Sequence, residues 1–559
     1  MELRIKDFIK NENDCSGSFA KAVFSMEDGD TLLLEGGTYH FYPDDAYRRE
    51  CYVSNNDSGE KAIALPVLNK KNITVDGGGA DLVFHGMMVP ILCEASENIT
   101  LKNFSIDYAT PFYAQAKILS VGPQGILIQF DGEDFNCRVR NGNLSFYSPC
   151  DGWEIETERT LVLEFDQEGH PSPYSKVYFS YTGKETDHGF QSSLYQTVTP
   201  EQQGENLIFM RGNVGERHCV GNYLVMTFAG RKCPGILITD SKDVFVESIH
   251  LYHTAAMGII AQKTENVSLK RILAEPRKGS GRFLSTAADA THFVNCRGKI
   301  SLERCKFVQM MDDAANIHGI YHPYTEKHAD GSLKLTVGHP QQKGIQIYRK
   351  GDRVAVIDGE KNETRAVGTV LEARLISPTE IRLKLDCDVP SPATNWITEN
   401  LSTAPRVHFL ECESGYNRPR GFLISTAGKV LVEKCKFYNM SSGIQLSGEA
   451  KGWYESGRVT DVEIRDCDFY NSAYAGGVAI KCKPSLWCTD TVFNQKITIE
   501  NNRFTQSARR ICAIESCEEV IFRNNVFHLD PNLPRHAMHG EDGTTFENCI
   551  KLTKEAILT

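Results

Sequence analysis

The sequence predicts an all-β protein: a right-handed parallel β-helix (solenoid) with inserted small antiparallel β-barrel domains. Eight segments repeat one pattern of apolar residues, two long stretches interrupt that pattern, and 45 glycines accompany few long helical patterns. The length of 559 residues exceeds what one compact globule usually holds. A solenoid can grow to that length because each repeat contacts only its neighbours.

The repeated pattern is apolar, x, apolar, x, x, small or apolar, x, apolar. Alternation indicates a strand with one buried face, and the extra residue indicates a bend that returns the chain to the same face. Where nothing intervenes, the copies start roughly 23 to 36 residues apart, so stacking would align them in ladders. The copies are residues 99–106, 244–251, 267–274, 300–307, 430–437, 462–469, 497–504 and 520–527.

The sixth position of the pattern carries a small or polar residue in several copies. We expect Cys305, Cys435 and Cys467 to be free, inward-facing thiols, since this position is buried in the other copies. Asn502 and Asn525 would satisfy backbone groups of the turns from inside the coil. No CxxC pair with a matching partner occurs among the 18 cysteines, so a zinc site is not expected.

The interruptions divide the chain into five parts. Residues 1–107 would form an N-terminal cap and the first coils, with a short helix at 16–24 over the open end and the first rung at 31–39. Residues 108–231 and 320–407 would be inserted barrel-like domains, because alternating strands and turns replace the repeat there. Residues 232–319 and 408–559 would be β-helix coils, the former carrying an acidic site.

Composition narrows the partners and the location. A net charge of −11 argues against nucleic acid or an anionic membrane as the partner. No apolar run is long enough to span a bilayer, and the charged start has no secretion signal, so we expect a cytoplasmic protein, or a secreted one if the sequence was trimmed. We expect no cofactor, and the oligomeric state stays open.

The candidate catalytic residues are three aspartates. Asp312 and Asp313 are adjacent where a turn should feed a short strand, and Asp289 lies 23 residues earlier. That interval is about one repeat, so stacking would bring Asp289 and Asp312 together on neighbouring rungs. Clustered carboxylates on an extended β surface are what acid–base cleavage of a glycosidic bond requires.

Polar and aromatic residues near these acids are candidates for substrate binding. Asn316 and His318 follow on the outward side of the next strand, and His292 follows Asp289 at short range. The loop at 447–455 supplies Glu449 and Trp453. An aromatic face suits the apolar face of a pyranose, although Trp453 could instead cover the next coil.

Other interpretations stay open on the residues alone. Acidic rungs can hold Ca²⁺. A pectinase-like hydrolase or lyase could act on acidic polysaccharide, but a lyase needs a basic residue beside its acids, and no lysine neighbours the Asp-Asp pair. A non-catalytic glycan-binding solenoid is the third possibility. The turn at 418–421, which contains two arginines, could bind an acidic partner or cap the coil.

The fragments at 288–293 and 311–319, together with the interrupted repeat, resemble glycoside hydrolase family 110. That family comprises inverting exo-α-1,3-galactosidases on a right-handed parallel β-helix with inserted β-barrels. The resemblance implies that Asp289, Asp312 and Asp313 are the active-site carboxylates. It also implies a partner that is an oligosaccharide or glycoconjugate with terminal α-galactose, of the blood-group-B or linear α-1,3 type.

The expected mechanism is hydrolysis with inversion. Asp312 and Asp313 would hold and deprotonate the water, and Asp289 would protonate the leaving oxygen. Inverting enzymes keep their carboxyl groups roughly 6.5–9.5 Å apart so that a water fits. Rungs of a parallel stack lie about 4.8 Å apart, so one rung plus an offset along the strand would reach that range.

Overall fold

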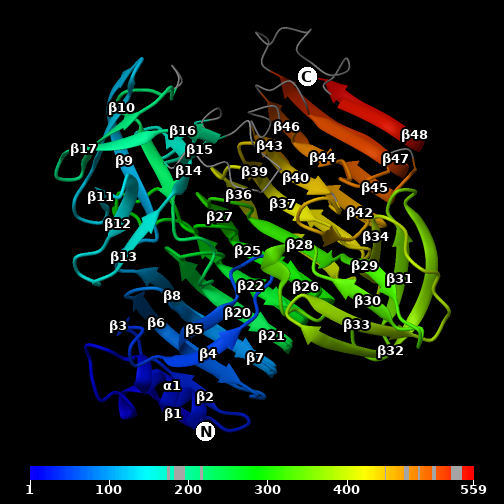
Figure 1. Cartoon of the computed structure of the whole chain (residues 1–559), viewed down its shortest axis with the longest axis horizontal. Helices are drawn as coiled ribbons and strands as arrows, with labels where there is room; N and C mark the ends of the chain where they lie inside the picture. The colour runs from blue at the N-terminus through cyan, green and yellow to red at the C-terminus, as the bar shows by residue number, and fades with distance from the viewer. Residues whose placement is uncertain are drawn as a thin grey trace.

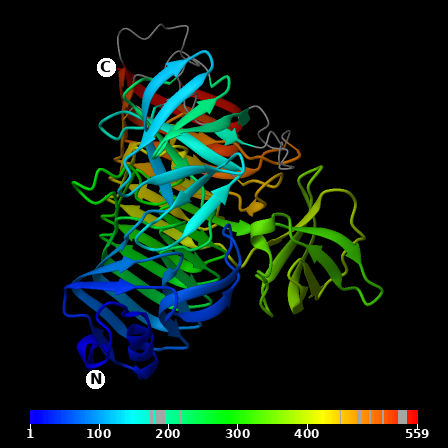
Figure 2. The same ribbon diagram turned by 60° about the vertical axis from the view of Figure 1, so that its left-hand side comes forward.

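The computed structural model describes residues 1–172, 177–181, 195–214, 218–446, 448–470, 478–488, 491–506, 511–529 and 544–558. The chain is a parallel β-helix that runs from the blue N-terminal end to the red C-terminal end in Figure 1. It carries two insertions, the second of which projects clearly from the coil in Figure 2. The predicted fold class is confirmed.

Three parallel sheets form the walls of the coil. We call the one that carries the acidic residues the site sheet. Its strands follow in order along the coil: β7 (Val89–Glu94), β20 (Ile236–Thr239), β22 (Ile259–Gln262), β25 (Thr291–Val294), β28 (Ala315–Ile320), β37 (Arg420–Ile424), β40 (Ser442–Leu446) and β44 (Ile480–Cys482).

The repeated pattern of the sequence forms the other two sheets. Its first half makes a sheet of β6 (Thr74–Phe84), β8 (Glu97–Tyr108), β21 (Lys242–Leu251), β23 (Glu265–Lys270), β26 (Arg297–Glu303), β35 (Arg406–Leu410), β38 (Val430–Glu433), β42 (Asp461–Arg465) and β45 (Asn494–Glu500). Its second half makes the third sheet, to which the ends of β6, β8 and β21 contribute together with β24 (Leu273–Ala274), β27 (Lys306–Val308), β36 (Glu413–Gly415), β39 (Lys436–Tyr438), β43 (Asp468–Tyr470) and β46 (Arg503–Gln506). The long strands β47 (Cys512–Leu529) and β48 (Thr544–Leu558) end the coil.

The interior consists of aligned side chains. The rings of Phe437 and Phe469 stack with centroids 4.8 Å apart, and Phe469 and Phe504 follow at 4.9 Å. These distances equal the spacing of neighbouring strands, so each ring packs flat on the ring of the next rung. Cys305, Cys435 and Cys467 are each 1 % exposed and free, as predicted.

The cysteine ladder has one member that the sequence pattern did not reveal. Residues 407–414 form a further copy of the repeat and place buried Cys412 beside Cys305. Its last position is Ser414 instead of a large apolar residue, which hid it. The asparagine prediction is confirmed, because Asn502 and Asn525 are buried and donate their amides to backbone carbonyl oxygens of Ile464 and Ile499.

The N-terminal end is covered as expected. Helix α1 (Ser16–Ser25) packs Phe19 edge-on against Tyr39 and Phe41. The coil begins one strand earlier than predicted, since β1 (Glu2–Arg4) pairs with β2 (Thr31–Leu33). Strands β3 (Thr38–Phe41), β4 (Tyr47–Cys51) and β5 (Gly59–Leu68) complete this end.

The first insertion separates β8 from β20. Its described residues form an eight-stranded sheet of mostly antiparallel strands and a three-stranded sheet. The eight strands are β9 (Tyr113–Gly122), β10 (Gly125–Phe130), β14 (Arg159–Phe165), β15 (Val177–Ser180), β16 (Tyr195–Thr197), β17 (Thr199–Gly204), β18 (Leu207–Arg211) and β19 (Tyr223–Thr227). The three are β11 (Asn136–Arg140), β12 (Asn143–Tyr147) and β13 (Glu154–Thr157).

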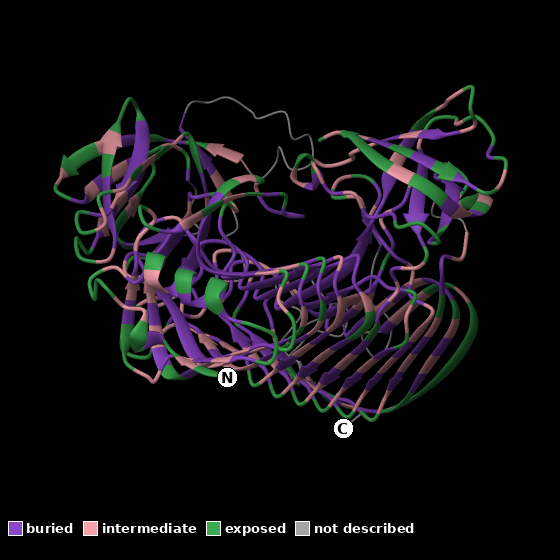
Figure 3. Ribbon diagram, turned by 90° about the horizontal axis from the view of Figure 1, so that it is seen from below, coloured by how far each residue is buried: buried purple, intermediate pink, exposed green. Residues whose placement is uncertain are grey.

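The second insertion separates β28 from β35 and is a closed barrel. Its strands are β29 (His322–Lys327), β30 (Leu333–Thr336), β31 (Arg353–Asp358), β32 (Glu363–Ser377), β33 (Glu380–Leu385) and β34 (Trp396–Asn400). The first insertion comes directly before β20, and the second comes directly after β28; both strands belong to the site sheet. They therefore flank the site sheet at opposite ends of its strands, as Figure 3 shows.

In the described part of the chain, no helix has the length and apolar character needed to cross a membrane.

Candidate active site

The three aspartates meet at the end of the site sheet where its strands begin. Asp289, Asp312 and Asp313 each place one carboxylate oxygen within 4.8 Å of the others. Asp289 and Asp312 therefore come together on neighbouring rungs, as predicted. Thr291 of β25 pairs with Ala315 of β28, 24 residues later. Asp289 therefore aligns with Asp313 on the next rung, and Asp312 lies one residue to the side.

The next rung supplies an arginine at the same position. Ala315 of β28 pairs with Phe422 of β37, so Arg420 is aligned with Asp313. Its Nε and Nη2 donate to the two carboxylate oxygens of Asp313 at 2.9 and 2.6 Å. Position 421 must be glycine, because a Cβ there would lie 2.3 Å from the carbonyl oxygen of Gly443. The rungs can approach closely enough for this ion pair only without that side chain.

Two further arginines bind Asp312 from opposite sides. Arg231, at the end of the first insertion, donates to Oδ2 at 2.5 Å, and Arg418 reaches Oδ1 at 3.3 Å. No motif in the sequence indicates Arg231, and the turn at 418–421 by itself predicts only a docking or capping role for Arg418 and Arg420. No lysine neighbours the Asp-Asp pair in the sequence, but the folded chain brings arginines to it from segments far away in the sequence.

Burial and charge act differently on the three acids. Asp289 and Asp313 are 2 % and 1 % exposed, whereas the Asp312 side chain is 17 % exposed. Burial raises the pKa of Asp289, and the charge of Asp312 adds to this, against the effect of Arg231 and Arg420. Burial also raises the pKa of Asp313, and Arg420 opposes that shift. The site therefore favours keeping a proton among its buried acids.

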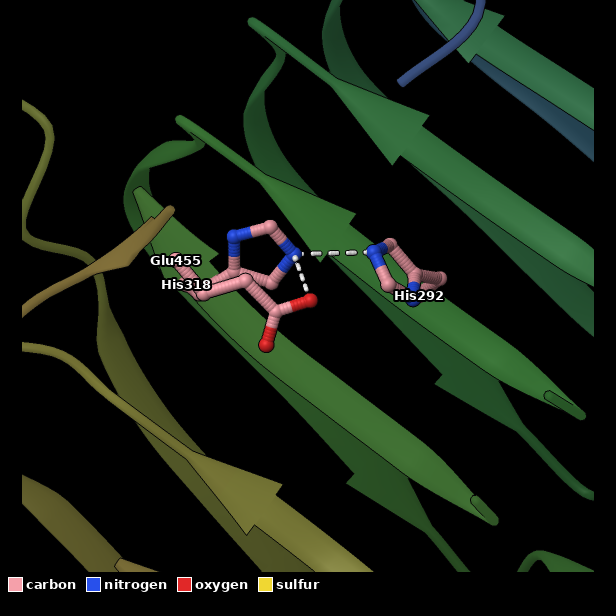
Figure 4. Close-up of side chains that lie close together, drawn as sticks. All are labelled: His292, His318 and Glu455. Carbon is pink, nitrogen blue, oxygen red and sulfur yellow. Dashed lines mark hydrogen bonds and ion pairs between the residues drawn. The ribbon is translucent and has the colours of Figure 1, made fainter. Parts of the chain in front are cut away.

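A pair of histidines continues from Asp289 along the outer face of the site sheet. His292 Nδ1 lies 2.6 Å from Asp289 Oδ2, and His292 Nε2 lies 2.9 Å from His318 Nε2 (Figure 4). His318 Nδ1 lies 2.6 Å from the carbonyl oxygen of Gly319. Both rings are almost fully buried, so the predicted sugar ligands are engaged with one another.

Glu455 joins this group from a distant loop. Strand β41 (Glu455–Ser456) pairs antiparallel with the end of β28, and Glu455 Oε1 lies 3.5 Å from His318 Nε2. The same oxygen accepts a hydrogen bond from Asn55 Nδ2 at 2.8 Å. Gly319 permits this approach, because a Cβ there would lie 2.2 Å from Ser456 Oγ. Glu455 is not among the predicted site residues, although it is the last residue of the 447–455 loop that supplies Glu449 and Trp453.

The other loop residues differ in their fit to the predicted role. Glu449 accepts backbone N–H groups of Lys451, Gly452 and Trp453, so it shapes the loop, and the expected sugar contact is not supported. Trp453 is 37 % exposed and stacks on His339 of the second insertion with centroids 4.2 Å apart. Arg231 lies 5.4 Å from its ring centre, which places this indole at the edge of the acidic site.

Asn316 and Tyr178 complete the surroundings. Asn316 lies on β28 beside His292 of β25, and within the described chain its buried Oδ1 has no hydrogen-bond partner. Burial raises the pKa of Tyr178 of β15, and the charges of Arg418 and Asp312 also act on it. Tyr178 therefore brings the first insertion next to the aspartates.

Among the described residues, two groups of side chains have the composition of metal sites. They are the three aspartates, and His292 with His318 and Glu455. Guanidinium groups already neutralise the aspartates, and hydrogen bonds account for the contacts of the second group. The predicted alternative of a calcium site is therefore not favoured by the charges.

A β-helix with inserted domains, a buried carboxyl cluster and polar groups around it defines the class of carbohydrate-active β-helix proteins. Two family models match the chain: the GLAA-B beta-barrel domain II at residues 332–394 and the right handed beta helix region at 400–551.

The chain is 31 % identical to alpha-1,3-galactosidase A of Shewanella woodyi over 519 residues, covering 90 % of this chain and 81 % of that one. It is 30 % identical to alpha-1,3-galactosidase B of Phocaeicola vulgatus over 542 residues, covering 92 % and 86 %. Alpha-1,3-galactosidase B of Bacteroides thetaiotaomicron is 28 % identical over 535 residues, covering 93 % and 84 %. The chain belongs to glycoside hydrolase family 110.

Proposed function

We propose that this protein is an exo-acting glycoside hydrolase that releases terminal α-1,3-linked galactose with inversion of configuration. The substrates would be blood-group-B-type or linear α-1,3-galactosides. The observation that carries the proposal is the trio of aspartates, gathered on neighbouring rungs and paired with three arginines. The activity named for the relatives supplies the sugar and the linkage.

The roles of the acids follow from their contacts, because burial raises the pKa of both Asp289 and Asp313. Asp312 and Asp313 accept hydrogen bonds from guanidinium groups, which favour their ionised forms, so they are suited to orient and deprotonate a water. Asp289 has no guanidinium hydrogen bond in the described chain, so it is suited to keep its proton and give it to the leaving oxygen.

The separation of the acids bears on the stereochemistry. One oxygen from each acid lies within 4.8 Å of the others, shorter than the expected inverting separation. By separation alone, the site favours a retaining enzyme. However, both oxygens of Asp313 accept from Arg420, and those of Asp312 accept from Arg231 and Arg418. A carboxylate engaged in this way is a poor nucleophile toward the sugar, which supports attack by water and hence inversion.

The insertions support cleavage at a chain end. The charge of Asp312 acts on Tyr178 of the first insertion, and Trp453, stacked on His339 of the second insertion, lies beside Arg231, which binds Asp312. An open β-helix face would accept a long polymer along its length, whereas these side chains restrict it. A terminal galactose with its linked sugar fits this arrangement.

Proton NMR of the first product from the methyl glycoside of α-1,3-galactobiose tests the proposal. We expect β-galactose to appear before mutarotation, together with methyl galactoside, whose anomeric centre is fixed. Initial α-galactose would overturn inversion, and mixed oligosaccharides formed early from a long galactan would overturn exo action. Release of uronate or of an unsaturated product would indicate the pectinase-like or lyase alternative. Binding without any release would indicate a glycan-binding solenoid.

A further inference from the structure

The histidine pair next to Asp289 has a hydrogen-bond order that can be deduced from its far end. His318 Nδ1 lies 2.6 Å from the carbonyl oxygen of Gly319. A carbonyl oxygen only accepts hydrogen bonds, so the proton of this bond belongs to His318 Nδ1. A neutral imidazole carries one N–H, which leaves His318 Nε2 as an acceptor.

This acceptor determines the tautomer of the next ring. His292 Nε2 lies 2.9 Å from His318 Nε2 and must donate, because two unprotonated nitrogens would repel each other. If His292 is neutral, its Nδ1 has no proton. The 2.6 Å bond between His292 Nδ1 and Asp289 Oδ2 then needs a proton from the carboxyl group.

The surroundings decide whether His292 is neutral. Its side chain is 1 % exposed, and burial holds the pKa of His292 well below its ordinary value. His318 and Arg231 act in the same direction, whereas Glu455 and Asp312 oppose them. Glu455 is a weak partner at 3.5 Å from His318 Nε2, and its oxygen accepts from Asn55.

We propose that His292 and His318 are positioning residues that hold Asp289 as a neutral carboxylic acid, with its proton in the bond to His292 Nδ1. The Gly319 carbonyl oxygen sets the direction of this series of hydrogen bonds, which ends at Asp289 among the aspartates. Four carboxyl groups (Asp289, Asp312, Asp313 and Glu455) face three guanidinium groups (Arg231, Arg418 and Arg420) in the site. One proton on Asp289 therefore balances the charge of this site.

The catalytic consequence rests on the proposed function. As the glycosidic C–O bond breaks, the Asp289 O–H turns from His292 Nδ1 to the leaving oxygen and gives it the proton. A water oxygen forms the new bond to the anomeric carbon and gives its proton to Asp312 or Asp313. The proton then returns to Asp289 within the cluster, and the pair of histidines stabilises it there for the next cycle.

Nitrogen-15 NMR of histidine rings tests the proton placement without substrate. The 16 histidines are labelled, and the two signals are assigned by their loss in His292→Gln and His318→Gln. At neutral pH we expect the Nε2–H tautomer for His292 and the Nδ1–H tautomer for His318. An imidazolium at His292 would overturn the proposal, because Asp289 would then be ionised. Two Nδ1–H rings would also overturn it, since His292 Nδ1 would then donate to Asp289, and the proton of that bond would not belong to the carboxyl group.

The pH profile of kcat/KM separates positioning from a purely structural role. Asparagine at 292 can place an oxygen near the Nδ1 position and still accept from Asp289, whereas glutamine places its amide nearer Nε2. We expect His292→Gln to move the basic limb to lower pH by about one unit, a tenfold change in the protonation equilibrium of Asp289. His292→Asn should move it less.

The control is His322→Gln, a buried histidine in the barrel that bonds to Tyr348. The His322→Gln substitution should leave the basic limb of the kcat/KM profile at the same pH. An unmoved basic limb in folded His292→Gln would show that His292 only fills space. If the wild type releases no galactose, the proposed function fails, but the NMR result still decides where the proton lies.

Discussion

Arg420 and Asp313 occupy the same position on neighbouring rungs, although 107 residues separate them in the sequence. The closed barrel between β28 and β35, followed by one more turn of the coil, accounts for that interval. The pair is bidentate, and Asp313 is 1 % exposed, so it is a buried ion pair in which each partner depends on the other.

Removing Arg420 should lower the free energy of unfolding and shift the pH profile of kcat/KM. Arg420→Met leaves Asp313 buried without its partner, and we expect a loss of about 3–5 kcal/mol in the free energy of unfolding. Arg420 holds the pKa of Asp313 down, so its loss raises that pKa further. A base must be ionised to act, and the acidic limb of kcat/KM should therefore move to higher pH.

The matched control is Arg465→Met. Arg465 pairs with Glu433 across aligned rungs of the same coil, but this pair is partly exposed. We expect a change of about 0–1 kcal/mol and an unmoved pH profile. Equal effects of the two substitutions in urea unfolding would contradict the special role of the buried pair.

The aspartates should be needed for turnover and not for folding. We expect Asp312→Asn and Asp313→Asn each to reduce kcat by about 10²–10⁴-fold on an aryl α-galactoside, because water activation is lost. Asp461→Asn, a surface change on the same coil, should have no effect. Near-normal turnover in both site variants, with an unchanged circular dichroism spectrum, would show that Asp312 and Asp313 are not the catalytic residues.

Gly319 should control the position of Glu455. A methyl group at 319 would lie 2.2 Å from Ser456 Oγ and push β41 away from His318. We expect Gly319→Ala to lower stability by about 1–3 kcal/mol and to reduce kcat/KM. Gly122→Ala meets nothing within 4 Å and serves as the control.

Adding Ser456→Gly to Gly319→Ala removes the clash. We expect the double variant to recover most of the lost kcat/KM and stability, measured by progress curves and thermal unfolding. An equally inactive double variant would mean that Gly319 acts by some route other than the approach of β41.

The buried thiols of the cysteine ladder should resist chemical modification, and replacing one with a polar residue should lower stability. Cys435→Ser places a hydroxyl group in an apolar stack, and we expect a loss of about 1–3 kcal/mol. Cys150→Ser is the control, since Cys150 is exposed and should change stability little. Titration with a thiol reagent should label Cys150 and Cys219 quickly in the native protein. Rapid labelling of Cys435 would contradict its inward position.

The repeat was readable from the sequence because its signal is local. Alternation and the bend act within eight residues, and like residues align wherever the period is uninterrupted, as Cys435, Cys467, Asn502 and Asn525 show. The copy containing Cys412 was missed because Ser414 replaces the last apolar residue. The spacing of about one repeat predicted that Asp289 meets the Asp312-Asp313 pair, but only the register of 24 residues between β25 and β28 shows that Asp313 is the aligned residue, since a shift of one residue changes which side chain is aligned.

The sequence by itself determined the coil, its interior and the three aspartates, since all of these follow from residues close together in the chain. The tertiary structure alone decided the partners of those aspartates. Arg231 returns from the first insertion, Arg420 follows the second, and Glu455 comes from a later loop. A solenoid brings positions together by rung number, and insertions of arbitrary length hide that number, so only the folded chain shows which charges meet.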